Sequence, residues 1–522
     1  MFSRPTSITA VDDASIPIPP HVKGRQFRLY NVLMILAMGF GSVSYGYSAG
    51  VISQTLGQPS FIRYFKLDKR SDATDIIGLM NSLYQAGGFI GTFCVSFFSD
   101  RYGRRAGIAI PSVINIIAGA LLAGSVNVGM FIFFRFVSGM AAYWIVSSVP
   151  VLMTEIAPPN VRGTLVNIHG ALLIFGFALS NWVGYGFYHI NQWRAPFAIQ
   201  CLPSVSLLLV IFWLPESPRW LILKDNIEEA AKVLKKLHTS AEAEVELAQI
   251  RTQVEIDRGL QTSYWSMLSK PSYRKRTFMA LFVTVGIQMT GPFVINNYGP
   301  TLYRGLGFDT NEQLVYQLGW ITVAFGGALL SLVAIELVTR PVIIAGGILG
   351  SAICLTVEAA LVARYATNAD DLANPNQAAL RAAVAMLFIY IFWFEITVDG
   401  GQFVYMGEIF PTHLRAKGIS LGMAGLCATN IIWLQVAPLA FETIKWKFYL
   451  CFIIPSFLCG AVILIWFPDT RGVPLESIAA IFGDATEPVD SSSYKSQDYE
   501  KVDVNNMGKT DNQTTSDHME NV

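Results

Sequence analysis

Acidic and basic residues occur in this chain as two matched segments, each at the end of a long apolar stretch. The octet from Glu155 to Arg162 returns as the octet from Glu408 to Arg415, 253 positions later, with its acid, isoleucine, proline and arginine in the same places. A second acid, Glu216 in a Pro-Glu-Ser-Pro-Arg segment, returns as Asp469 at the same offset. Carboxylates and arginines form forked ion pairs. Their duplication across two apolar halves predicts a transporter built from two related membrane bundles.

Other kinds of chemistry find no support in the sequence. No nucleophile stands beside a base, and no nucleotide-binding motif is present. The six cysteines lie in apolar stretches without zinc-ligand or C-x-x-C spacing. We therefore predict that the chain is not an enzyme and that it uses no cofactor and no metal.

The composition points to a membrane protein. The 522 residues are 52% hydrophobic and only 14% charged, whereas soluble domains carry about 25% charged residues. The formal net charge is zero, which argues against nucleic acid as a partner. The expected partners are the lipid bilayer and a small-molecule solute, with protons as a candidate co-substrate.

Twelve segments have the length of about 20 residues that a helix needs to cross the hydrocarbon core. We therefore predict an all-α polytopic membrane protein with twelve transmembrane helices in two six-helix bundles. The spans fall near residues 28–51, 76–98, 106–124, 128–152, 165–188 and 196–214, and near 277–300, 314–336, 341–363, 382–406, 418–440 and 446–467.

The polar segments divide the chain further. Residues 227–261 form helices, and the run from Glu228 to Leu237 carries its apolar residues on one face. The predicted organisation is an N-terminal tail (1–27), a six-helix bundle (28–214), a helical linker (215–276), a second bundle (277–467) and a C-terminal segment (468–522), disordered beyond about residue 484. Lys and Arg gather in the linker and in the loops on its side of the membrane, so both termini are expected in the cytoplasm.

The charged motifs, taken in order, carry a resemblance. Asp100-Arg101-Tyr102-Gly103-Arg104-Arg105 lies between spans two and three, and it is followed by Arg135, the two octets, and the Glu216 and Asp469 segments. In this order they resemble the sugar porter family of the major facilitator superfamily. Tyr45-Gly46-Tyr47-Ser48 and Asn296-Asn297-Tyr298-Gly299-Pro300 are similar to fungal hexose and lactose-type members, which implies the major facilitator fold and a plasma membrane location.

This resemblance implies that the charged residues form cytoplasmic ion pairs that hold the inner gate shut. The Glu336–Pro341 loop, which loses the glycine and the second arginine, predicts a weaker network in the second half. The expected gate residues are Asp100, Arg101, Gly103, Arg104, Arg105, Arg135, Glu155, Arg162, Glu216, Arg219, Glu336, Arg340, Glu408 and Arg415.

The chain departs from the family pattern at its central positions. Proton-coupled members carry an acid in the first span where this chain has Ser48, so the residue Arg135 lacks its expected partner. Glu395 and Asp399, four apart in span ten, are candidates for a replacement proton site or a polar substrate contact, because acids inside a membrane span are usually functional. The alternative is that one of them lies near an outer water-filled mouth. Facilitated and proton-coupled transport both remain open.

The expected solute cavity combines polar groups with aromatic walls. Several polar contacts of the family, amide or ring N–H, are lost, since Phe293 and Phe403 stand at an asparagine and a tryptophan position, so the cavity is expected to be more apolar than an ordinary hexose site. The candidate substrate-binding residues are Gln288, Thr290, Phe293, Asn296, Asn297, Phe403, Asn430, Trp433 and Gln435.

The function predicted is transport of a sugar or sugar-like solute by alternating access. Two alternatives stay open. One is a transporter of a non-sugar solute such as an exported secondary metabolite, which the lost amides favour. The other is a nutrient receptor that binds without carrying, which the modest C-terminal tail does not favour.

Overall fold

Long helices make up the structure, a computed structural model that describes residues 29–156, 162–237, 240–258, 263–335, 337–366, 376–471 and 481–482. No strand occurs among these residues. The prediction of an all-α protein with twelve spans is confirmed. The predicted disordered tail and residues 1–28 lie outside the described ranges. In the N-terminal half the spans are α1 (Leu29–Leu56), α3 (Ala73–Tyr102), α4 (Arg104–Ala123), α5 (Val128–Ile156), α6 (Arg162–Tyr188), and α7 with α8 (Arg194–Ile199, Cys201–Ile211).

The C-terminal half has six spans as well, and two of them are interrupted. Span seven is α13 and α14 (Pro271–Gln288, Pro292–Gly305), and span ten is α18, a π-helical turn and α19 (Gln377–Phe394, Glu395–Asp399, Gly400–Ile409). The other four are α15 (Thr310–Ala334), α16 (Arg340–Tyr365), α20 (Thr412–Thr443) and α21 (Leu450–Trp466). Short helices α2 (Pro59–Tyr64), Leu67–Lys69 and Lys445–Tyr449 connect spans.

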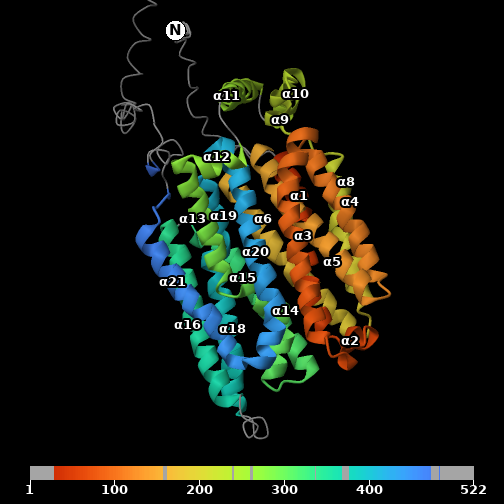
Figure 1. The fold of residues 1–522 in the computed structure, drawn as a ribbon. Helices are drawn as coiled ribbons and strands as arrows, with labels where there is room; N and C mark the ends of the chain where they lie inside the picture. The colour runs from red at the N-terminus through yellow and green to blue at the C-terminus, as the bar shows by residue number, and fades with distance from the viewer. Residues whose placement is uncertain are drawn as a thin grey trace, which may run out of the picture. The chain divides into compact units, whose positions relative to one another are not determined.

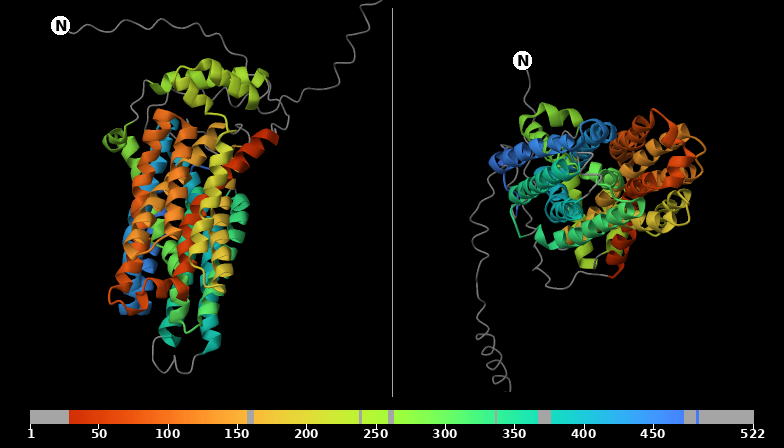
Figure 2. Two further views of the ribbon diagram at one scale, coloured as in Figure 1. Left: turned by 90° about the vertical axis from the view of Figure 1, so that its right-hand side faces the viewer. Right: turned by 90° about the horizontal axis from the view of Figure 1, so that it is seen from below.

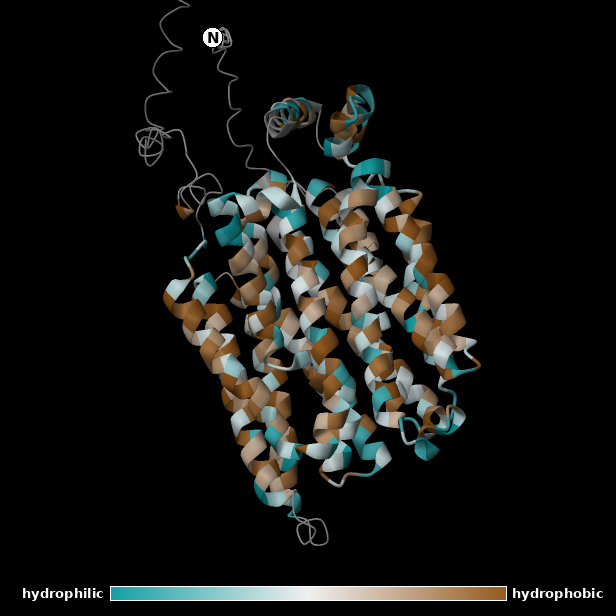
Figure 3. Ribbon diagram, viewed as in Figure 1, coloured by the Kyte–Doolittle hydropathy of each residue, from teal (hydrophilic) through white to brown (hydrophobic). Residues whose placement is uncertain are grey.

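Eleven helical segments in the described part of the chain are long and apolar enough to cross a membrane, and α3 is the span that falls short. Its buried face carries Asn81, Ser82 and Gln85, which lower its hydropathy. These polar groups are tolerated because they are buried in the protein, where α3 packs on α5 and α20. The lipid-facing sides of the other spans are predominantly hydrophobic (Figure 3).

The break in span seven follows directly from its sequence. Gly291 adopts the left-handed conformation with φ of 78°, which a residue without a side chain reaches at little cost. Pro292 then begins α14 at the position where its missing N–H is not needed. This turn places Gln288 at the end of one helix and Asn296 in the first turns of the next.

Two bundles meet along a central interface (Figures 1 and 2). Within the N-terminal half α1 packs on α6, α5 and α8, and α3 packs on α5. Within the C-terminal half α16 packs on α18 and α21, and α13 packs on α20. The halves touch through α3 with α20, α6 with α15, and α1 with α14.

Helices α9 (Pro218–Leu223), α10 (Ile227–Leu237), α11 (Ser240–Arg258) and α12 (Tyr264–Ser269) join the halves at one end, called here the linker end (Figure 1). The opposite end, with α2 and Leu67–Lys69, is called the distal end. The amphipathic pattern predicted for the linker is confirmed, because Ala230, Val233 and Leu237 of α10 are buried. They join one apolar cluster with Val149 and Leu152 of α5.

Glycine lets α3 and α5 approach closely, and this generates a prediction. A Cβ atom on Gly87 would lie 2.0 Å from the carbonyl oxygen of Phe136, whereas one on Gly186 of α6 would meet nothing within 4 Å. Gly87→Ala should lower the stability by about 1–3 kcal/mol through overpacking. Gly186→Ala should leave it unchanged or raise it by about 0.5–1 kcal/mol. Thermal unfolding of the detergent-purified chain checks both, and equal melting temperatures would contradict the packing account.

Candidate transport cavity

A charged cluster lies at the linker end of the N-terminal half. The guanidinium group of Arg104 contacts Glu155 at 3.3 Å and Asp100 at 2.7 Å. Glu216 accepts hydrogen bonds from the backbone N–H groups of Arg104 at 2.9 Å and Arg105 at 3.3 Å, which places a carboxylate at the start of α4, where a helix favours negative charge. Burial raises the pKa of the Glu216 carboxyl, while these backbone hydrogen bonds oppose the rise.

The C-terminal half repeats this arrangement, and its acids Glu408 and Asp469 are the ones that the sequence offset of 253 relates to Glu155 and Glu216. Arg340 contacts Glu408 at 2.9 Å. Asp469 accepts a hydrogen bond from the backbone N–H of Arg340 at 3.1 Å, and Thr470 donates its hydroxyl to Glu408 at 2.5 Å. A weaker network was expected in this half. Among the described residues Arg340 pairs with one carboxylate, whereas Arg104 pairs with two, at 2.7 Å and 3.3 Å. Each cluster lies within one half.

The other predicted gate residues lie around these clusters. Gly103 has φ of 100° and connects α3 to α4. Arg101 lies over the ring of Tyr102, and Arg105 donates to the backbone carbonyl oxygen of Ile211. Arg219 lies in α9 and Arg415 in α20, each near the first turn. The side chain of Arg162 and the residue Glu336 lie outside the described part of the structure.

Arg135 lies apart from the linker-end clusters, deep in the N-terminal half. It is 1% exposed, and its guanidinium group donates to the backbone carbonyl oxygen of Ser48 at 2.9 Å and stacks over the ring of Tyr84. Among the described residues it has no carboxylate partner. The geometry thus agrees with the sequence expectation that replacing the first-span acid by Ser48 leaves Arg135 without an ion pair.

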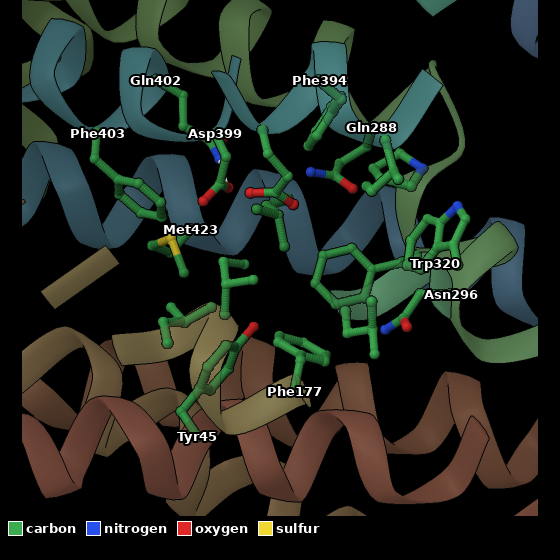
Figure 4. Close-up of a pocket in the computed structure, with 18 residues that line it drawn as sticks. Tyr45, Phe177, Gln288, Asn296, Trp320, Phe394, Asp399, Gln402, Phe403 and Met423 are labelled. Carbon is green, nitrogen blue, oxygen red and sulfur yellow. Dashed lines mark hydrogen bonds between the residues drawn. The ribbon is translucent and has the colours of Figure 1, made fainter. Parts of the chain in front are cut away.

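A cavity of about 70 Å³ lies between the two halves (Figure 4). Tyr45 and Phe177 face it from the N-terminal half, and Asp399, Gln402 and Phe403 face it from the C-terminal half (Figure 4). Six residues that the sequence singled out line it: Gln288, Phe293, Asn296, Glu395, Asp399 and Phe403.

The remaining predicted binding residues do not line this cavity. Trp433 packs against Phe452, with ring centroids 4.9 Å apart. Gln435 accepts a hydrogen bond from Ser82 of the other half at 2.7 Å. Asn430 donates to the side-chain oxygen of Gln288 at 3.2 Å, so it orients a cavity residue from behind. Thr290 and Asn297 are buried beside the break in span seven without lining the cavity.

Several lining residues escaped the sequence analysis. Phe177, Trp320 and Phe394 look like ordinary residues of apolar spans, and Tyr45 was noted only as part of a family motif; helix packing turns all four toward the cavity. Gln402 carried a usable signal, because it follows Asp399 by three positions and residues three apart share a helix face. Its Nε2 atom donates to Asp399 at 3.0 Å.

The distal end of the cavity is closed by contacts between the halves. Ser53 donates to the backbone carbonyl oxygen of Asn296 at 2.6 Å, and Gln54 donates to that of Leu314 at 3.2 Å. Asn81 of α3 donates to the hydroxyl of Tyr298 at 3.0 Å. Ligand sites usually occupy about 300–1,000 Å³, so the helices around this cavity must separate before a solute of ordinary size can bind.

Comparison with known proteins identifies the family. The model of the family described as "Sugar (and other) transporter" matches residues 34–482. The chain belongs to the sugar transporter family of the major facilitator superfamily. It is 30% identical over 455 residues to the MFS-type transporter criB of Aspergillus cristatus, covering 85% of this chain and 92% of that one. It is 28% identical to the low-affinity glucose transporter of Kluyveromyces lactis, covering 88% and 84% of the two chains.

The fold agrees with this assignment. The structure of the proton:xylose symporter XylE superimposes with a TM-score of 0.73 at 22% identity, covering 87% of this chain and all of that one. At that identity the likeness establishes the fold alone. Because the chain belongs to the sugar transporter family, the protein is a multi-pass membrane transporter, and the family is not one of enzymes.

The ion pairs at the linker end generate a second prediction. Glu408→Ala leaves the Arg340 guanidinium, whose side chain is 10% exposed, without its partner. It should lower the stability by about 1.5–3 kcal/mol, as expected for a hydrogen bond to a charged group. Glu229→Ala is the matched control, since its partner Lys232 is 68% exposed, and it should cost less than about 1 kcal/mol. The same melting temperature for both variants would argue against a structural role for the buried pair.

Proposed function

We propose that this chain carries a sugar or a sugar-like solute across the membrane by alternating access. The observation that carries the proposal is a set of buried polar atoms without a hydrogen-bond partner around the cavity: Trp320 Nε1, Glu395 Oε2 and Gln402 Oε1. Leaving such a group unpaired costs about 1–3 kcal/mol. A hydroxyl group both donates and accepts, so a solute with several hydroxyls satisfies all three.

The apolar lining suits the same kind of solute. Tyr45 and Phe177 present aromatic surface opposite the polar groups of span ten, and Phe177 packs on Phe293 across the interface with ring centroids 6.4 Å apart. The C–H faces of a sugar ring pack on aromatic rings while its hydroxyls bond to amides and carboxylates. The relation to a fungal glucose transporter supports this solute class.

Alternating access follows from where the bonds lie. The ion pairs at the linker end hold each half together internally, so each half can move as a unit. The hydrogen bonds of Ser53, Gln54 and Asn81 join the halves at the distal end and must break for the cavity to open there. We place the linker end in the cytoplasm, because Lys and Arg gather there, and the protein in the plasma membrane.

A non-sugar solute is the second candidate, and the lining gives it specific support. Phe293, Phe394, Phe403 and Met423 make the C-terminal wall largely apolar. Such a wall accommodates a solute with more hydrophobic surface than an unsubstituted hexose. An exported secondary metabolite would fit this description, as would a sugar derivative with apolar substituents.

Uptake by whole cells separates these candidates. The chain would be expressed in a yeast strain without its own hexose carriers, and uptake of labelled glucose, galactose, xylose and lactose would be measured. Saturable uptake of at least one sugar is the expected result. No uptake from protein shown to reach the plasma membrane would overturn the sugar proposal and favour a less polar solute.

A third prediction tests the cavity residues. Gln288 lines the cavity and its amide is oriented by Asn430, so Gln288→Ala should raise KM about 5- to 100-fold, equivalent to losing one buried polar contact of about 1–3 kcal/mol. Trp433→Phe is the control, because Trp433 packs on Phe452 away from the cavity, and its KM should stay close to that of the unmodified chain. Kinetics of sugar uptake measure both, and an unchanged KM for Gln288→Ala would remove this residue from the binding site.

A further inference from the structure

Two carboxylates of span ten face the cavity from an irregular turn of helix. Glu395 begins the π-helical turn and Asp399 ends it, and both line the cavity. Glu395 is 5% exposed, and its Oε2 atom has no hydrogen-bond partner. Gln402, on the next turn, is 2% exposed, lines the same cavity and has an unpartnered Oε1 atom. These atoms mark a place where a further group binds.

Neither carboxylate has a positive partner among the described residues. Arg135, the buried cation of the N-terminal half, is occupied by the backbone of Ser48 and the ring of Tyr84. The charge of these acids must therefore be balanced in another way, because a bare carboxylate in a low-dielectric interior costs several kcal/mol.

The titratable neighbours offer no balancing charge either. Tyr45 of α1 lines the cavity opposite the acids, and Tyr390 of α18 donates to the backbone carbonyl oxygen of Thr290. Glu358 of α16 accepts a hydrogen bond from Tyr449 and lies outside the cavity lining. The residues that α6, α15 and α20 contribute to the lining are not titratable: Leu173, Ile174, Phe177, Trp320, Ile321, Met423 and Leu426. Helix α16 packs on the π-turn at Gly347. The same helix packs on α19 at Ile344.

Gln402 makes the two acids unequal. Its Nε2 atom donates to Asp399 Oδ1 at 3.0 Å, and a hydrogen bond donated to a carboxylate favours its ionised form. Glu395 receives no such bond, and the apolar side chains of Ile391 and Phe394 line the same cavity. Glu395 thus differs from Asp399 in having no protein donor for its carboxyl group.

We propose that transport is coupled to protons and that Glu395, with Asp399 as its ionised neighbour, is the proton site. The inference rests on the proposed transport function and names the co-substrate of the same cavity. In this proposal the proton and the solute enter the same cavity, and the two are therefore exposed to the same side of the membrane together. Glu395 meets this condition because it lines the cavity. The acid absent from the first span, where Ser48 stands, is thus replaced from the other half of the molecule.

The π-turn supplies a means of exposing the proton site. Turns of this kind concentrate at functional sites, since they insert one residue into an α-helix. If the π-turn rewound into regular α-helix, the helix on one side of it would rotate by about 100° relative to the helix on the other side. Gly400 and Gly401 follow the turn, where a Cβ would lie 3.3 Å from Ile335 and 3.1 Å from Ile344, so this part of span ten packs closely on its neighbours.

Proteoliposomes that contain the full chain test the proposal. Labelled glucose, or whichever sugar the uptake assay identifies, would be presented with an inward proton gradient in sodium-free buffer. The expected result is accumulation above the external concentration, lost on adding an uncoupler. In Glu395→Gln, accumulation should fall to simple equilibration while exchange of labelled for unlabelled sugar without a gradient persists. Glu358→Gln, a buried acid away from the cavity, should accumulate like the unmodified chain.

The outcomes separate the two proposals. Exchange without accumulation in the unmodified chain would overturn proton coupling and leave sugar transport standing, as would accumulation that requires sodium. Accumulation retained in Glu395→Gln would move the proton elsewhere. If no sugar is transported, infrared spectra of the purified chain still test whether Glu395 carries a proton. A protonated-carboxyl band that titrates with pH and weakens in Glu395→Gln supports the assignment, and an unchanged band in that variant overturns it.

Discussion

The rest of the structure depends on one constraint: a polar group buried in an apolar surrounding needs a partner within the protein. The charged residues at the linker end satisfy one another as Arg104 with Glu155 and Arg340 with Glu408. Arg135 has no carboxylate partner among the described residues. It donates instead to the backbone carbonyl oxygen of Ser48 and stacks on the ring of Tyr84. Glu395, Gln402 and Trp320 each bring an unpaired polar atom to the lining of the cavity, where a solute with hydroxyl groups can pair with them.

The two halves share a frame and differ in chemistry. Glu155 and Glu408, and likewise Glu216 and Asp469, hold equivalent positions at the ends of corresponding helices. At the cavity the likeness ends, because the N-terminal half contributes mainly aromatic and aliphatic surface, while the C-terminal half contributes the amides and both acids. Binding a solute with hydroxyl groups on one side and C–H surface on the other uses this difference, and it also ties the polar half of the solute to the half that carries the acids.

Irregular helix geometry occurs in the two spans that supply the amides and the acids of the cavity. Gly291 and Pro292 divide span seven between Gln288 and Asn296, and the π-turn of span ten carries Glu395 and Asp399. Regular helices at these places would direct some of these side chains toward neighbouring helices. The same interruptions lower the cost of bending, since backbone already freed from the regular hydrogen-bond ladder rearranges more easily than an intact helix. Binding and movement are therefore located in the same segments.

Local sequence patterns and the internal duplication determined the helices and the equivalent acids of the two halves. Span length predicted twelve helices, helical periodicity predicted the buried face of α10, and the offset of 253 predicted the equivalent acids of the two ion-pair clusters. Which residues line the cavity was decided only by the tertiary structure. Asn430, Trp433 and Gln435 share one helix yet contact Gln288, Phe452 and Ser82 respectively. Phe177 and Trp320, inconspicuous in sequence, line the cavity. The physical reason is that a buried span is apolar all round, so its sequence does not mark the face that packing turns toward the partner half.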